Sequence, residues 1–65
     1  MKFKKFMDLY DNWNGVIRVN DNNLDMIVEG KTAYIAEKAE LHNMEVVAFG
    51  FYDHILTVRV NSKAN

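Results

Sequence analysis

The sequence has no cysteine and no proline among its 65 residues, and only three glycines. Without cysteine, no disulfide or thiolate zinc site can hold the fold together, and no cysteine nucleophile is available. We therefore expect no metal and no other cofactor. A chain this short buries only about 60% of the surface that it exposes when unfolded, which predicts marginal stability. Either one chain packs well enough alone, or a second copy completes the core as a homo-oligomer.

An excess of charge of one sign is also lacking. Eight basic and nine acidic residues give a net charge of −1. Nucleic-acid-binding domains usually carry a strong basic bias, and a DNA mimic would carry an acidic one, so nucleic acid is disfavoured as a partner. The basic start, with Lys2 and Lys4, is followed by Asp8 rather than by the apolar stretch of a signal segment. No apolar run is long enough to span a bilayer. We expect a soluble cytoplasmic protein that contacts no membrane.

What is present fits one small globular domain. The 49% hydrophobic content predicts a folded domain over residues 1–61, with 62–65 as a frayed tail. Phe3, Phe6, Met7 and Tyr10 recur at the spacing of one helix face, which predicts a helix from residue 3 to about residue 10. A short strand beginning at Lys2 is the alternative. Residues 12–15 (Asn-Trp-Asn-Gly) then indicate a helix C-cap and a turn.

The middle of the chain indicates a β-hairpin. Residues 16–19 are rich in β-branched side chains, 20–23 are turn-forming, and 24–29 alternate, with Leu24, Met26 and Val28 on one face. Gly30 and Lys31 end the second strand. Thr32 then predicts an N-cap for a helix from residue 33 to about residue 42. The apolar side of that helix would comprise Tyr34, Ile35, Ala39 and Leu41.

The last third predicts a second hairpin. Residues 45–52 are apolar almost throughout, as in a central strand covered on both faces, with Phe49 and Phe51 in the core. A turn at 53–54 leads to a strand over 55–60, with Leu56, Val58 and Val60 facing inward. The expected fold is therefore α+β: a single domain of order α-β-β-α-β-β, with a mainly antiparallel four-stranded sheet and helices packed on one face.

Residues that could perform chemistry form no recognisable active site. Gly30-Lys31-Thr32 ends like a phosphate-binding loop, but the earlier glycine that such a loop needs is missing. His42 and His54 have no third metal ligand and no adjacent nucleophile in any known spacing. The oxygen-rich turn at 20–23 lacks the calcium-loop pattern. We therefore predict that the protein is not an enzyme and has neither catalytic nor metal-binding residues.

Aromatic residues near turns are the strongest binding signal. Trp13 lies in a polar turn, Tyr10 precedes it by about one helical turn, and Tyr52 borders a second turn with Asp53. Tryptophan and tyrosine dominate binding hot spots in protein interfaces. We predict a partner-binding patch of Tyr10, Trp13, Tyr52 and Asp53. The alternative is that Trp13 folds back as a lid over the core.

Three segments, residues 9–15, 28–31 and 46–53, resemble small uncharacterised proteins of phages and mobile elements in Firmicutes. The resemblance covers nearly the whole chain and carries no active-site residue. It implies an accessory role. Some proteins of this kind inhibit host defence by covering the working surface of a defence protein, as anti-CRISPR proteins do.

Two functions remain open from the sequence. The first is a non-enzymatic protein-binding module that blocks a bacterial host protein sterically, as an inhibitor of a defence system. The alternative is a homo-oligomeric sponge that holds a small nucleotide-like ligand between subunits. In that case aromatic rings would stack on the base, and Arg18, Lys31 or Arg59 would contact the phosphate.

Overall fold

The computed structural model describes residues 1–12 and 14–61. Their elements follow the predicted order, with one additional 3₁₀ turn labelled η1. The bounds are α1 (Phe3–Leu9), β1 (Val16–Asn20), β2 (Met26–Lys31), α2 (Thr32–Ala36), η1 (Ala39–Leu41), β3 (Glu45–Tyr52) and β4 (Ile55–Asn61). The predicted frayed tail at 62–65 lies outside the described residues.

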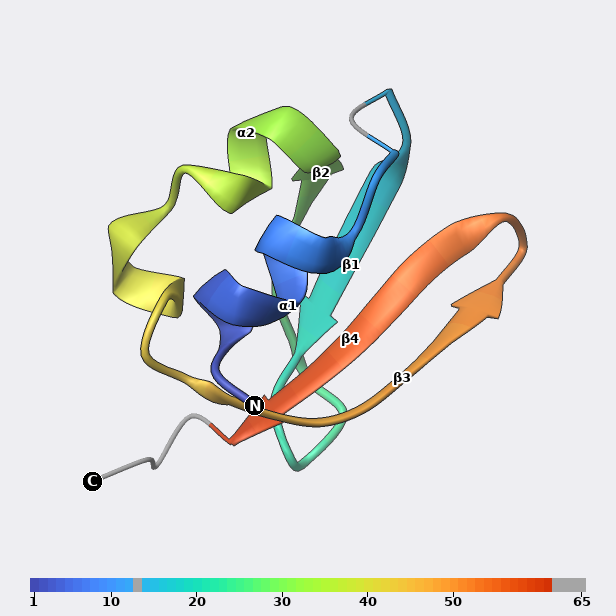
Figure 1. The fold of residues 1–65 in the computed structure, drawn as a ribbon. Coiled ribbons are helices and arrows are strands. Elements are labelled where there is room, and N and C mark those ends of the chain that lie inside the picture. The colour runs from blue at the N-terminus through green and yellow to red at the C-terminus, as the bar shows by residue number, and fades with distance from the viewer. Residues whose placement is uncertain (13, 62–65) are drawn as a thin grey trace.

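The four strands form one mixed sheet in the order β2-β1-β4-β3. Two antiparallel hairpins, β1–β2 and β3–β4, meet at its centre, where β1 and β4 run parallel. Both helices and η1 lie on one side of this sheet (Figure 1). The predicted α+β fold, with a mainly antiparallel sheet covered on one face, is confirmed.

The core lies between the helices and the two central strands. Alternate residues of β1 and β4 point toward the helical side, as the period of a strand requires. They meet one buried face of each helical segment. The buried hydrophobic residues are Phe3, Met7, Ile17, Val19, Ile35, Leu41, Leu56, Val58 and Val60. The inward positions of Leu56, Val58 and Val60 are therefore confirmed, as is the apolar stripe of α1, whose Phe6 and Tyr10 pack half-buried at its margin.

The predicted place of β3 is wrong. β3 is an edge strand rather than a central one, and Phe49 and Phe51 are 63% and 61% exposed rather than buried in the core. A continuous apolar run is compatible with either place in a sheet. The order of strands depends on the parallel pairing of β1 with β4, which puts β4 at the centre and leaves β3 outside it.

The predicted helix over 33–42 is also wrong in part. The chain is helical in α2, becomes extended at Lys38, and turns again in η1. Ile35 and Leu41 are both buried, yet residues six apart in one continuous α-helix point about 120° away from each other. The break lets both side chains reach the core. Thr32 is not an N-cap: it is the first residue of α2, its side chain is buried, and no side chain caps this helix.

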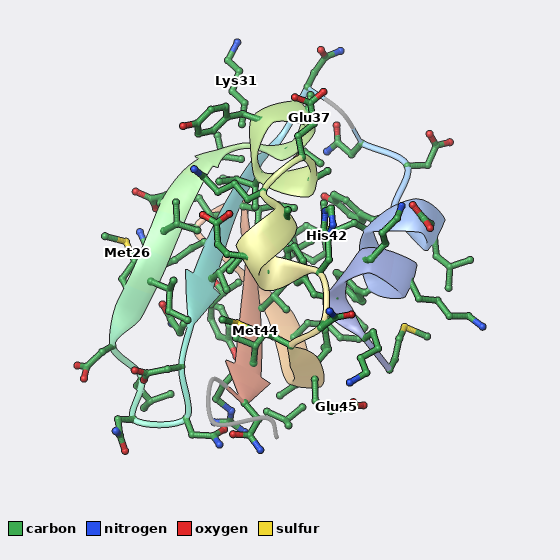
Figure 2. The ribbon with its side chains drawn as sticks, turned by 90° about the vertical axis from the view of Figure 1, so that its left-hand side faces the viewer. Met26, Lys31, Glu37, His42, Met44 and Glu45 are labelled. Atoms are coloured by element: carbon green, nitrogen blue, oxygen red, sulfur yellow. The ribbon has the colours of Figure 1, made fainter. Side chains whose placement is uncertain are left out.

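The turns differ in detail from the sequence prediction. Asp21 accepts backbone N–H bonds from Asn23 and Asp25 through its side chain, so the predicted turn chemistry at 20–23 is confirmed. Leu24 belongs to this turn, with φ of 67°, and is exposed. Met26 is exposed at the outer edge of β2 (Figure 2). Of the three residues predicted to face inward from this strand, only Val28 packs against the core, and it is half-buried.

The turn at residues 12–15 closes with a bond from the Gly15 N–H to the Asn12 carbonyl, as predicted. It does not cap α1, because the helix ends at Leu9 and Tyr10 is already extended. The β3–β4 turn is a tight two-residue connection, with φ of 53° at Asp53 and 66° at His54. These values are typical of the type I′ turn that joins twisted antiparallel strands.

Candidate functional site

An apolar hollow lies between α1 and the hairpin of β3 and β4. Its volume is about 340 Å³, and we call it the α1–β3 groove. It is lined by Met1, Phe6, Leu9, Tyr10, Phe49, Phe51 and Leu56. Both walls are aromatic, and none of the lining side chains is charged. The surface of this small domain therefore includes one concentrated apolar depression.

The groove exists because the helical layer is shorter than the sheet. α1 has seven residues and is about 10 Å long. The outer part of the β3–β4 hairpin extends past it (Figure 1). Phe49 and Phe51 pair across the ladder with the buried Val58 and Leu56, so their side chains lie on the helical side of the sheet. No described helix covers them there, and they remain exposed.

Aromatic contacts hold the groove in shape. The ring of Phe6 stacks on that of Tyr10, with 6.4 Å between centroids, and meets that of Phe49 at 5.1 Å and a tilt of 57°. Such offset and tilted pairs add about 0.5–1.5 kcal/mol each beyond the area that they bury. A chain of three rings thus connects the helix wall to the strand wall, and the groove is formed before any partner arrives.

The chemistry of the lining limits what can bind. The volume falls within the range of small-ligand pockets. With no charged side chain in the lining, an apolar group fits better than a phosphate or a carboxylate. The Tyr10 hydroxyl, near the Asn12 amide at 3.5 Å, is a polar group at the margin. Large apolar groups are therefore the occupants that this lining favours.

The structure separates the residues predicted to form one binding patch. Tyr10 lines the α1–β3 groove. Tyr52 is 64% exposed and lines a smaller hollow, which shares Phe49 with the groove but is otherwise lined from the helix-free side of the sheet, while Asp53 lies in the β3–β4 turn. Trp13 lies outside the described residues, so its predicted role as hot spot or lid stays a prediction.

The smaller hollow, of about 90 Å³, is more polar. Its lining includes Asn20, Tyr52, Thr57 and Arg59. The buried side-chain oxygens of Asn20 and Thr57 have no hydrogen-bond partner among the described residues. The nearby Arg18 is engaged, because its guanidinium lies 2.7 Å from the Glu29 carboxylate. Arg59 is therefore the better placed of these two arginines to meet an anionic ligand.

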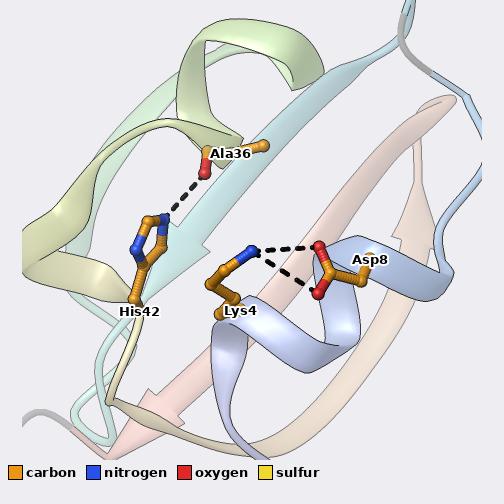
Figure 3. Close-up of polar contacts among 4 residues, drawn as sticks. All are labelled: Lys4, Asp8, Ala36 and His42. Atoms are coloured by element: carbon orange, nitrogen blue, oxygen red, sulfur yellow. Dashed lines mark hydrogen bonds and ion pairs between the residues drawn. The ribbon is translucent and has the colours of Figure 1, made fainter.

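The histidines are not brought together. His42 follows η1, and its Nε2 lies 2.8 Å from the Ala36 carbonyl (Figure 3), whereas His54 occupies the β3–β4 turn. Within residues 1–12 and 14–61 no three histidine or acidic side chains are grouped as a metal site requires. None of the described helices has the length and apolar character needed to cross a membrane.

Two ion pairs involve residues of the N-terminal segment. Lys4 and Asp8 form an ion pair on the exposed face of α1 at 3.3 Å (Figure 3). The N-terminal ammonium of Met1 pairs with the Glu45 carboxylate. This ammonium, by hydrogen bonding and charge, lowers the pKa of Glu45 from its ordinary value. The pair fixes the start of the chain against the start of β3.

Six groove residues were not predicted to bind: Met1, Phe6, Leu9, Phe49, Phe51 and Leu56. Leu9 falls outside the helix stripe that packs on the core, and Phe49 and Phe51 were assigned to the core. One signal was available. In residues 48–51 the large Phe49 and Phe51 alternate with Ala48 and Gly50, which is typical of a strand with one apolar face rather than two.

Comparisons with protein-family models, with curated proteins and with solved structures gave no match to this chain.

Proposed function

We propose that this chain is a non-enzymatic protein-binding module that acts through the α1–β3 groove. The observation that carries the proposal is the exposure of Phe49 and Phe51 in a preformed apolar hollow. Large exposed apolar patches on soluble proteins usually mark interaction sites. Preformed rings lose little conformational freedom on binding, so contacts with them cost less than contacts with flexible side chains.

The biological setting of this proposal rests on the resemblance to phage and mobile-element proteins. In that setting the partner is a bacterial host protein, and the module blocks its working surface as an anti-defence inhibitor. Steric blocking needs only shape and affinity. It fits a small domain that carries an apolar groove on its surface.

The test is capture of partners by tagged protein from a Firmicute lysate, followed by measurement of the dissociation constant with the purified partner. Replacing Phe51 with Lys should weaken binding about thirtyfold, which corresponds to the roughly 2 kcal/mol of a hot-spot residue. Met26→Lys is the matched control, because Met26 is also exposed, at 58%, but lies on β2, outside the groove. Trp13→Ala, in the same assay, tests the predicted role of Trp13.

Each variant is first checked for folding by urea unfolding, where exposed positions should shift stability by less than about 0.5 kcal/mol. A partner retained by Phe51→Lys as well as by Met26→Lys would contradict the proposal. A captured protein with no role in defence would contradict the anti-defence setting but not the binding module.

The smaller hollow favours a second candidate, the sponge for a small nucleotide-like ligand. Tyr52 offers a ring for stacking, and Arg59 is an exposed guanidinium for a phosphate. Native mass spectrometry of protein purified from cells would reveal such a ligand as added mass. Loss of that mass in Arg59→Gln, with retention in Arg18→Gln, would support it.

A further inference from the structure

The outer edge of β3 is largely unpaired among the described residues. Its beginning is covered, because Lys2 forms an antiparallel bridge with Glu45 and the Val46 N–H donates to the Met1 carbonyl. From residue 47 to residue 52 no described residue pairs with this edge. A β-bulge between Val46 and Ala48 interrupts the ladder at the beginning of this stretch. Residues 48–52 lack the charged residues and prolines that usually protect edge strands. β2, at the other edge of the sheet, carries Glu29 and Lys31.

The direction of the backbone groups follows from the hairpin turn. In a two-residue type I′ hairpin the flanking pair, here Tyr52 and Ile55, exchanges both ladder hydrogen bonds. Such pairs recur at every second residue. The N–H and C=O groups of Gly50 therefore point to β4, and those of Phe49 and Phe51 point outward from the sheet. The side chains of these two phenylalanines flank the same open edge.

We propose that β3 pairs antiparallel with β3 of a second copy of this chain, about a two-fold axis at Gly50. In this register Phe49 of each copy lies opposite Phe51 of the other, and the outward N–H and C=O groups of these residues are satisfied. Gly50 lies opposite Gly50 in a non-hydrogen-bonded pair, where the Cα atoms approach to about 4.5 Å. With no side chain at that point, the approach is free of clashes.

The other face of the strand is complementary in the same register. Tyr52, the largest side chain there, lies opposite Ala48 of the second copy. The ring of Tyr52 extends over its own Gly50, since a Cβ at Gly50 would lie 3.2 Å from it. Large side chains thus face small ones on this face, and phenylalanines face phenylalanines on the other. An isologous interface requires this kind of self-complementarity.

The exposed area is sufficient for a modest dimer. At roughly 200 Å² per aromatic side chain, the exposed fractions of Phe49, Phe51 and Tyr52 correspond to about 380 Å². A standard interface buries about 800 Å² on each partner. The three rings supply at most about half of that, because the parts of Phe49 and Phe51 that line the groove stay open, and the backbone strip with the neighbouring Val47 adds to it. We expect a dissociation constant in the micromolar range, and a net charge of −1 on each copy opposes association little.

Dimerisation would extend the α1–β3 groove rather than fill it. The two grooves would join into one depression, floored by four phenylalanines and flanked by α1 of each copy. This consequence rests on the proposed function, because the host partner would then dock on a surface made by both copies. The strand pairing itself does not depend on a host partner and is tested without one.

The chain has no cysteine, so a single introduced thiol reports the register directly. Gly50→Cys places two thiols across the two-fold axis, within the Cα separation of 4.4–6.8 Å that a disulfide needs. We expect a cross-linked dimer with diamide as oxidant. Ala48→Cys is the control. In this register its two copies lie four residues apart along the strands, about 13 Å, which is too far for a disulfide.

A change in the backbone alone tests the strand pairing in case Gly50→Cys does not fold. At 65 residues the chain is accessible to chemical synthesis, and N-methylation of Phe49 removes one outward N–H without changing any side chain. Sedimentation equilibrium from 1 µM to 1 mM should show a monomer–dimer equilibrium for the unmodified chain. The N-methylated chain should dimerise at least about tenfold more weakly.

Three results would overturn the proposal: a monomer at every concentration, dimerisation unaffected by N-methyl-Phe49, or cross-linking of Ala48→Cys as fast as that of Gly50→Cys. A monomer that still loses its host partner in Phe51→Lys would overturn the dimer and leave the proposed function intact. A dimer with no host partner would support the pairing and count against the proposed function.

Discussion

At the scale of single residues, Thr32 is the one polar side chain that is fully buried among the described residues. Its backbone N–H donates to the Gly15 carbonyl at 2.9 Å, which ties α2 to the turn before β1. Its hydroxyl has no hydrogen-bond partner among residues 1–12 and 14–61. A buried hydroxyl without a partner costs free energy, because it gives up water and gains nothing in return.

We expect Thr32→Val to raise the free energy of unfolding by about 1 kcal/mol, since valine keeps the shape and removes the unpaired hydroxyl. Thr32→Ala should instead lower it, because the methyl group that fills the core is lost as well. Urea unfolding of both variants measures the difference. A loss of stability in Thr32→Val would mean that the hydroxyl is satisfied in solution, for example by an ordered water.

At the scale of elements, α2 and η1 are too short to be stable as isolated helices. They are held by burial of Ile35 and Leu41 and by the contact of His42 with the Ala36 carbonyl. That carbonyl accepts from the Nε2–H of His42, so the ring ties the end of η1 back to the end of α2 (Figure 3).

We expect His42→Ala to lower the free energy of unfolding by about 1 kcal/mol, the usual net value of a hydrogen bond of this kind. Glu40→Ala is the control within the same 3₁₀ turn, because Glu40 is exposed, and it should change stability by less than about 0.5 kcal/mol. Equal effects of the two substitutions on the urea midpoint would show that the His42 contact contributes nothing.

Local sequence patterns predicted some features of these elements and not others. The stripe of α1 and the alternation of β4 were predicted correctly, because spacing along a few residues decides which face is buried. The place of β3 was not, because an apolar run does not reveal the strand order. The break between α2 and η1 is likewise imposed by the core, since Ile35 and Leu41 must point the same way. Of the residues that line the groove, only Tyr10 was predicted to bind a partner. The groove itself could not be predicted, because it depends on the place of β3 in the sheet.

At the scale of the whole molecule, the ion pair between the N-terminal ammonium of Met1 and the Glu45 carboxylate joins the start of the chain to the first residue of the edge strand β3. The pKa of Glu45 is lower in the folded state than its ordinary value of 4.5. A carboxyl group of this kind stabilises the folded state above its unfolded pKa. It loses that contribution as the pH falls through the lower, folded pKa.

We therefore expect Glu45→Gln to be less stable than the unmodified protein at pH 7 and equally stable near pH 2, where both side chains are uncharged. The effect should be small, because the pair is exposed, and it should shrink as salt is added. Thermal unfolding at several pH values measures it. A difference that persists unchanged at pH 2 would show that the amide disturbs something other than the charge.

The parallel pair of β1 and β4 has a consequence for how the chain reaches this structure. Ile17 and Leu56 are neighbours in the sheet but lie far apart along the chain. Each hairpin can close locally, yet neither has a core until that distant pair docks, and closing such a long loop is slow. The outer edge of β3 is open throughout this process and stays open in the folded domain. We therefore expect strand pairing between newly made chains to compete with folding.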